Sequence, residues 1–283
     1  MKIGFNQATS LKCSTLEKDL KLCDKMGFDF IEIRFDQLKA YMETNSLETL
    51  SKSFSCMHIK PHAMNAVYLK PFIYSNQCDP VLQEAFDMEF LNACDLARQV
   101  GSKCIVIVPP FVEPAYEGTR DEATETCVRA LKKMSDVAGS FKINLAFELV
   151  GLRKSMVRTI KHAVEIVEKV DRPNVGYTFD AFNIYCANKS NDFSDLQLAQ
   201  KDKIFVVHVN NADGYGLDYK DQSHRRLCDK GVVDLTGFLY QLNRLGYQGM
   251  ISIETFRDEY GQWKPDLLVQ KAYNTTKDLI KDQ

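Results

Sequence analysis

Short β-type runs alternate with amphipathic helical stretches along the whole chain, and this alternation limits the fold more than any other feature. Eight apolar runs are typical of strands, and helix-like segments lie between them. The runs are KIGFN from Lys2, FDFIEIRF around Asp29, CMHIKPHAM from Cys56, KCIVIVP from Lys103, KINLAFELV, NVGYTFDAF, KIFVVHVNN and GMISIETF. Strict alternation of eight strands with helices in 283 residues predicts one (β/α)8 TIM barrel domain over residues 1–283.

The ends of the helical stretches carry their own signals. The first stretch, LEKDLKLCDKMG, ends at Gly27, and a second begins at Asp79-Pro80 and ends at Gly101. SMVRTIKHAVEIVEKV, VDLTGFLYQLNRLG and PDLLVQKAYNTTKDLI follow the same rule. The rival fold, a doubly wound open sheet, usually announces a glycine-rich first turn. Gln-Ala-Thr-Ser follows the first strand here, so the barrel is favoured.

Composition excludes several classes of partner. Lys and Arg total 36 against 38 for Asp and Glu, so the formal net charge of −2 gives no broad basic surface for nucleic acid. The longest apolar stretch, around CIVIVPPFV, is too short to span a bilayer, and MKIGFNQATS lacks the apolar segment of a signal peptide. The nine cysteines form no CxxC pair and are expected to be reduced. We expect a cytoplasmic protein that binds a small molecule, with neither nucleic acid nor membrane as partner.

Four polar residues stand at the ends of the later strands, where barrel enzymes build their active sites. They are Glu148 in LAFELVG, Asp180 in YTFDAF, His208 in VVHVNN and Glu254 in SIETF. Any one of them alone is more often a helix cap, a solvated residue or a core histidine. Together, three carboxylates and one imidazole favour one divalent metal ion with open coordination positions, which Mn²⁺, Mg²⁺, Co²⁺ or Zn²⁺ could fill.

These segments resemble a known family over nearly the whole length of the chain. HIKPHAMNAV, AFELVG, NVGYTFDAF, KIFVVHVNN, GVVDL and IETFRDEY are similar to the sugar phosphate isomerase/epimerase superfamily, whose members are xylose isomerase-like barrels. Within it, the chain resembles the inosose (2-keto-myo-inositol) isomerases of inositol catabolism. The resemblance implies that Glu148, Asp180, His208 and Glu254 are the metal ligands. It also implies that Arg225, in SHRRLCDKGVVDL, holds substrate oxygens.

The chain departs from the family pattern around this metal core. Asn183 stands where the family commonly has a histidine, and an amide can bond a hydroxyl but cannot carry a proton. Tyr185 replaces an aromatic nitrogen, Cys228-Asp229 replaces Pro-Gly, and Asn210-Asn211 replaces an acidic pair. These changes place the identity of the substrate in question more than the chemistry.

The ligand set and the resemblance predict a divalent-metal-dependent isomerase or epimerase of a keto-sugar or inosose-type ketocyclitol, with Mn²⁺ preferred. Proton transfer would pass through a cis-enediolate. Glu148 and Glu254 are expected to act both as ligands and as proton shuttles, and Arg225 to steady an enediolate oxygen. Substrate hydroxyls would meet Asn183, His62 and Asn6, with His58, Glu32 and Arg34 as further candidates and Trp263 and Phe182 as an apolar wall.

Other functions stay open on the same barrel. A metal-dependent lyase or dehydratase, or a 3-keto-glycoside deglycosidase, would use the same intermediate. An endonuclease acting at abasic DNA sites is disfavoured because its sites are rich in histidine, whereas this chain has five. A binding barrel without activity is disfavoured because all four ligand types are present. The native metal, the exact substrate and the assembly into a homo-oligomer are not fixed by the sequence.

Overall fold

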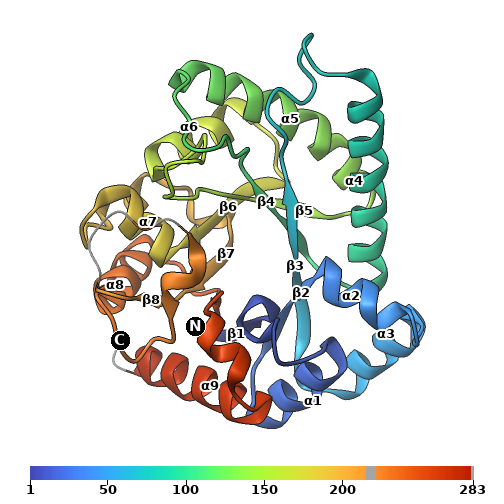
Figure 1. Cartoon of the computed structure of the whole chain (residues 1–283), viewed down its shortest axis with the longest axis vertical. Coiled ribbons are helices and arrows are strands. Elements are labelled where there is room, and N and C mark those ends of the chain that lie inside the picture. The colour runs from blue at the N-terminus through green and yellow to red at the C-terminus, as the bar shows by residue number, and fades with distance from the viewer. Residues whose placement is uncertain (215–218, 220, 282–283) are drawn as a thin grey trace.

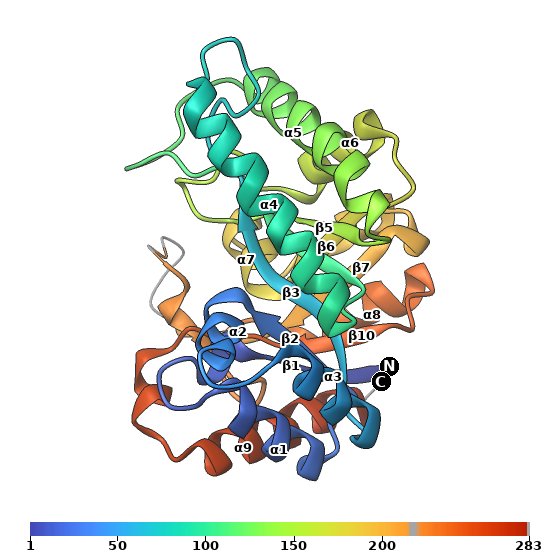
Figure 2. The ribbon, with the colours of Figure 1, turned by 90° about the vertical axis from the view of Figure 1, so that its right-hand side faces the viewer.

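Eight parallel strands close into a barrel in the computed structural model, which describes residues 1–214, 219 and 221–281. Helices surround the strands (Figures 1 and 2). Around the barrel the strand order is β1-β10-β7-β6-β5-β4-β3-β2. The strands are β1 (Lys2–Asn6), β2 (Phe30–Arg34), β3 (Lys60–Tyr68), β4 (Cys104–Val108), β5 (Asn144–Glu148), β6 (Val175–Asp180), β7 (Ile204–Val209) and β10 (Met250–Ile253). The predicted (β/α)8 barrel is confirmed.

The helices lie outside this barrel and cover its strands. They are α1 (Leu16–Met26), α2 (Phe35–Met42), α3 (Leu47–Cys56), α4 (Pro80–Val100), α5 (Arg120–Ser140), α6 (Ile160–Val170), α7 (Ala181–Asn188), α8 (Leu235–Leu245) and α9 (Pro265–Lys281). A short antiparallel pair, β8 (Asn211–Ala212) with β9 (Arg225–Arg226), follows β7. Single 3₁₀ turns occupy Gln7–Ser10, Ser194–Leu198, Lys201–Lys203, Gln222–His224 and Asp258–Gln262.

Local sequence explains where several helices begin and end. Gly27 and Gly101 close α1 and α4 with φ of 93° and 80°, a left-handed conformation that glycine adopts without strain. The Asp79 side chain accepts a hydrogen bond from the Val81 amide and so caps α4 ahead of Pro80. These three predicted helix ends are confirmed.

Two predicted boundaries were wrong. The strand expected over Cys56–Met64 lies instead over Lys60–Tyr68, because a helix capped by Ser46 continues through Cys56. The helix expected from Ser155 begins at Ile160, after the Thr159 cap, while Ser155 bridges to Phe111. Helices α2, α3, α5 and α7 were not among the predicted stretches, although Thr119 and Glu122 form a capping box at the start of α5.

The parallel sheet is buried from both sides, as a barrel covered by helices requires. Every residue of β4 and of β6 is buried. Parallel pairing also brings the carboxyl ends of all eight strands to one rim, where Asp180 of β6 is in register with His208 of β7. Within the described part of the chain, no helix combines the length and the apolar character needed to cross a membrane.

Candidate metal centre

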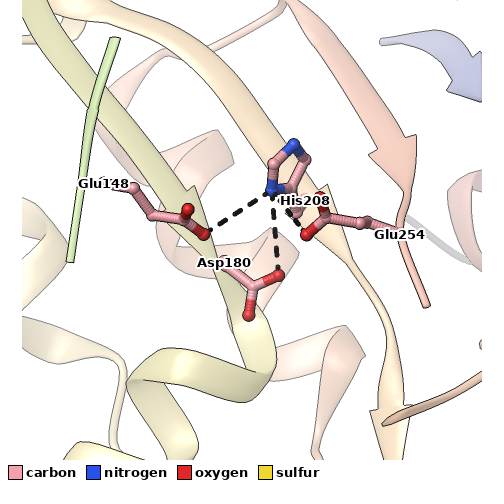
Figure 3. A group of neighbouring side chains, drawn as sticks. All are labelled: Glu148, Asp180, His208 and Glu254. Atoms are coloured by element: carbon pink, nitrogen blue, oxygen red, sulfur yellow. Dashed lines mark ion pairs between the residues drawn. The ribbon is translucent and has the colours of Figure 1, made fainter. Parts of the chain in front are cut away.

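Four side chains meet at the carboxyl rim of the barrel (Figure 3). Glu148 is the last residue of β5, Asp180 is the last of β6, His208 lies near the end of β7, and Glu254 directly follows β10. One donor atom from each lies within 4.8 Å of the others. All four residues are buried, with at most 6% of their surface exposed. The structure therefore brings together the four residues predicted as metal ligands.

The imidazole of His208 faces all three carboxylates with one nitrogen, as the dashed lines in Figure 3 indicate. His208 Nδ1 lies 3.2 Å from Glu254 Oε2, 3.8 Å from Glu148 Oε1 and 3.9 Å from Asp180 Oδ2. This buried nitrogen has no hydrogen-bond partner among the described residues. A nitrogen left without a partner and surrounded by carboxylate oxygens suits a shared cation.

The balance of charge in the cluster also favours a bound cation. Arg225 is 1% exposed, and one of its terminal nitrogens lies 2.9 Å from Asp180 Oδ2 and 2.5 Å from Glu254 Oε2. Its guanidinium lies over the rings of Phe182 and Phe256, at 5.3 and 5.4 Å from their centroids. Within the described chain, one guanidinium thus contacts two of three clustered carboxylates. Because buried charges need compensation, the residues present fit a divalent cation.

Three amides hold the carboxylates in place. Asn6 Nδ2 donates to Glu254 Oε1 at 2.9 Å, and Asn183 Nδ2 donates to Glu148 Oε1 at 3.0 Å. Asn210 Nδ2 donates to Asp180 Oδ2 at 2.7 Å. Asp180 also caps α7, because its other oxygen, Oδ1, accepts a hydrogen bond from the backbone N–H of Asn183 at 2.7 Å. The structure therefore shows Asn6, Asn183 and Asp180 in contacts that hold the site together, and substrate contact by Asn6 and Asn183 stays a prediction.

The two glutamates of the cluster have opposite pKa shifts. Burial, together with the charges of Glu254 and Asp180, raises the pKa of Glu148 to about 7, although His208 acts against this rise. Burial also acts to raise the pKa of Glu254, but His208 and Arg225 outweigh it and lower that pKa to about 2. A bound cation would favour the ionised form of both carboxyl groups.

A cavity of about 120 Å³ opens onto this group. A single water needs roughly 10–15 Å³ of such space, so the cavity has room for a small organic molecule. Glu148, Glu254 and Arg225 line it. The remaining lining residues are Asn65, Tyr68, Val108, Phe111, Val150, Leu152, Lys154, Asp221, Gln222 and Phe256.

The structure does not bring the predicted substrate residue His62 to this cavity. His62 lies near the start of β3, and its Nε2 contacts the Phe205 carbonyl at the start of β7, at 2.8 Å. The prediction failed because the strand extends to Tyr68, so that His62 lies far from its carboxyl end. His58 is also at the opposite end of the barrel, where it pairs with Asp29 at 3.4 Å.

The other predicted side chains divide between the site and its surroundings. Phe182 packs against Arg225 and is not among the residues lining the cavity, where it was expected to form an apolar wall. Trp263 packs on Tyr260, with ring centroids 4.8 Å apart, and is not among the residues lining the cavity. The Arg34 guanidinium makes a bidentate contact with the Asp36 carboxylate.

Sequence reasoning missed two features of the site. Glu32, expected to bind a substrate hydroxyl, instead contacts Nε2 of His208. Asn65, which was not predicted, donates to Glu32 and lines the cavity. An acidic residue inside the otherwise apolar run FIEIR was the available signal for Glu32. Nothing in the sequence distinguishes Asn65 from an ordinary polar residue.

Comparisons with known proteins agree with the fold and with the presence of a divalent-metal site. Residues 20–279 match the family described as the xylose isomerase-like TIM barrel. An inosose isomerase of Bacillus velezensis is 32% identical over 281 residues, which is 99% of this chain and 97% of that protein. A ketose 3-epimerase of Arthrobacter globiformis is 26% identical over 63% of this chain and 58% of its own length.

Among solved structures, the IOLI protein with a bound zinc atom is 32% identical, has a TM-score of 0.92, and is matched over 100% of this chain and 99% of its own. Full-length similarity to an inosose isomerase, a closed eight-stranded barrel and a buried acidic cluster with one histidine at its carboxyl rim all agree. The chain belongs to the xylose isomerase-like TIM barrel family.

Proposed function

We propose that this protein is a divalent-metal-dependent isomerase or epimerase that acts on a keto-sugar or an inosose-type ketocyclitol. One observation carries the proposal: Glu148 and Glu254 belong to the acidic cluster and also line the cavity beside it. A residue that only held a cation would not need to face the substrate space. The inosose isomerase and ketose epimerase relatives support this class of reaction.

The reaction moves one carbon-bound proton. A carboxylate removes the proton from the carbon next to the substrate carbonyl, and the electron pair passes to the carbonyl oxygen to give a cis-enediolate. Returning a proton to the same carbon from the other face gives an epimer. Returning it to the former carbonyl carbon, while the proton of the neighbouring hydroxyl passes to the former carbonyl oxygen, gives the isomeric ketone. Atoms and charge balance in both outcomes, so no oxidant is needed.

The chain supplies separate groups for these steps. Glu148 at the end of β5 and Glu254 after β10 are separated by β6 and β7 around the rim, so they approach the cavity from different sides. We assign the two proton transfers to them. Arg225 also lines the cavity and can donate to an enediolate oxygen through its fixed fork of N–H groups.

Glu148, Asp180, His208 and Glu254 are the residues we assign as ligands of the ion. A divalent ion held there would supply Lewis-acid stabilisation of the negative oxygen. Mn²⁺ suits three carboxylates and one imidazole, and we propose it as the native metal.

Asn183 and the cavity wall bear on the choice of substrate. The Asn183 carbonyl oxygen is buried and has no hydrogen-bond partner in the described part of the chain. Asn183 is not among the residues lining the cavity, so its contact with a substrate hydroxyl stays a prediction. We propose that the substrate is an uncharged polyhydroxy ketone of inositol catabolism.

All nine cysteines are free, as expected of a protein working in the reducing cytoplasm.

Paired substitutions test the roles of the two glutamates. Glu148→Gln and Glu254→Gln should each lower turnover of an inosose by at least about a hundredfold, the usual worth of general acid–base catalysis. Glutamine keeps a carbonyl oxygen that can still bind the metal, so added metal should restore occupancy but not the rate. Recovery of full activity in both variants with excess metal would contradict the proposed proton transfers.

A further inference from the structure

His208 meets a second acidic residue on the side that faces away from the cluster. Its Nε2 lies 3.1 Å from both Oε1 and Oε2 of Glu32, and both side chains are fully buried. Its other nitrogen, Nδ1, is the one that faces the three clustered carboxylates. The two nitrogens of the same ring are therefore held between two different acidic environments.

Glu32 is itself fixed by a neighbour. Asn65 Nδ2 donates to Glu32 Oε2 at 2.8 Å, so a chain of contacts runs from Asn65 on β3 through Glu32 on β2 to His208 on β7. Glu32 is fully buried and is not one of the residues lining the cavity, so it has no direct route to a substrate. Its contacts are directed at His208 instead.

Hydrogen-bond chemistry determines which ring nitrogen carries the proton. A neutral imidazole has one N–H donor and one acceptor, and an ionised carboxylate only accepts. In a neutral ring, a proton on Nε2 can be donated to Glu32, and the lone pair then lies on Nδ1 and is directed at the cluster. A histidine that binds metal usually donates its other N–H to a carboxylate or carbonyl group in this way.

We propose that Glu32 is a positioning residue that fixes the tautomer and the ring orientation of His208, so that Nδ1 is free to bind the divalent ion. This inference rests on the proposed metal centre and not on the proposed reaction. It assigns Glu32 a role different from contact with a substrate hydroxyl.

Zn²⁺ alone, without any substrate, is the probe for this inference. Glu32→Ala should weaken Zn²⁺ binding by about 10–100-fold, the range seen when the partner of a metal-bound histidine is lost. Glu32→Asp, which keeps a carboxylate, should recover part of that loss. Asp19→Asn is the matched control, because Asp19 is a buried carboxylate that bonds to Gln7 and Ser10 instead of His208. The Zn²⁺ affinity of the Asp19→Asn variant should stay within about twofold of that of the parent protein.

A second measurement needs no substituted protein. In the zinc-loaded parent chain with ¹⁵N-labelled histidine, NMR should show a proton directly bonded to Nε2 of His208 and none on Nδ1. The opposite tautomer, or equal Zn²⁺ affinities in the parent and Glu32→Ala, would overturn the role of Glu32 alone. Failure of the parent chain to bind Zn²⁺ would overturn the metal centre and this inference with it. Zinc bound as expected in a protein that turns over no ketone would overturn only the proposed reaction.

Discussion

The same substitution at Glu148 and at Glu254 should change the stability of the metal-free protein in opposite directions. Burial and neighbouring carboxylates raise the pKa of Glu148 from 4.5 to about 7. A carboxyl group whose pKa is raised in the folded state holds its proton more tightly there than in the unfolded chain. The free energy of unfolding therefore falls as the pH rises from about 4.5 to 7, and this cost remains in full above pH 7.

The size of the effect follows from this shift. Each unit by which the pKa differs between the folded and the unfolded protein corresponds to about 1.4 kcal/mol. At pH 8, ionised Glu148 therefore lowers the free energy of unfolding by about 3 kcal/mol. Glu148→Gln removes that cost, and the glutamine carbonyl can still accept from Asn183 Nδ2. At about 2.1 cal/mol/K of unfolding entropy per residue, a gain of about 3 kcal/mol raises the Tm by about 5 °C. At pH 5 the gain should almost vanish.

Glu254→Gln is the matched comparison. His208 and Arg225 lower the pKa of Glu254 from 4.5 to about 2, so its negative charge stabilises the folded state above about pH 4.5. Its two oxygens accept from Asn6 and Arg225, and a glutamine amide would face one of these donors with its NH₂ group. The variant should therefore unfold at a lower temperature than the parent at pH 8.

Thermal unfolding in a chelating buffer at pH 5 and pH 8 measures both effects. The reasoning fails if Glu148→Gln lowers the Tm at pH 8, or if the two variants shift it in the same direction. Adding Mn²⁺ should then raise the Tm of the parent by more than that of Glu148→Gln, because binding to the folded state adds RT ln(1 + [L]/Kd) to its stability.

Four further substitutions test the site and the core. Asp180→Asn and His208→Ala should each lower metal affinity by one to two orders of magnitude, and full occupancy after dialysis, measured by elemental analysis, would contradict the ligand assignment. Asn183→His should change the pH–rate curve or the substrate preference more than the metal content, since imidazole titrates near neutral pH; unchanged kinetics would mean that Asn183 does not face the substrate. Burial, and then the charge of Arg120, lower the pKa of His162 to about 4, so the free energy of unfolding should fall by about 1.4 kcal/mol per unit as the pH drops from about 6.5 towards 4. His162→Gln should flatten that slope in urea titrations, and an unchanged slope would assign it to other groups.

The barrel and its four rim residues could be predicted because both depend on local patterns. Each of Glu148, Asp180, His208 and Glu254 comes at the end of an apolar run, and parallel strands bring such ends to one rim. The position of a strand end was sufficient to place them. No knowledge of side-chain partners was needed.

The surroundings of the site depend on register, which the sequence did not reveal. Pairing shifts between Ile31 and Glu32 on β2 and between Met64 and Val67 on β3, so counting along the chain cannot tell which side chains of these strands face inward. His62 was placed at the wrong end of its strand because β3 extends to Tyr68 and does not end at Met64. Glu32 and Asn65 were missed as a hydrogen-bonded pair, because their contact joins two strands through such an irregular stretch.

Proton exchange with solvent is the sharpest test of proton transfer by Glu148 and Glu254. The metal-loaded protein should be incubated in D₂O with 2-keto-myo-inositol and, separately, with ketohexoses, and the carbon next to the carbonyl followed by NMR. We expect solvent deuterium at that carbon in the product of the accepted substrate, incorporated at a rate at least about a hundredfold lower in Glu148→Gln or Glu254→Gln. An isomerised product formed without any deuterium, or a product that has lost water instead of changing configuration, would contradict proton transfer by these two glutamates.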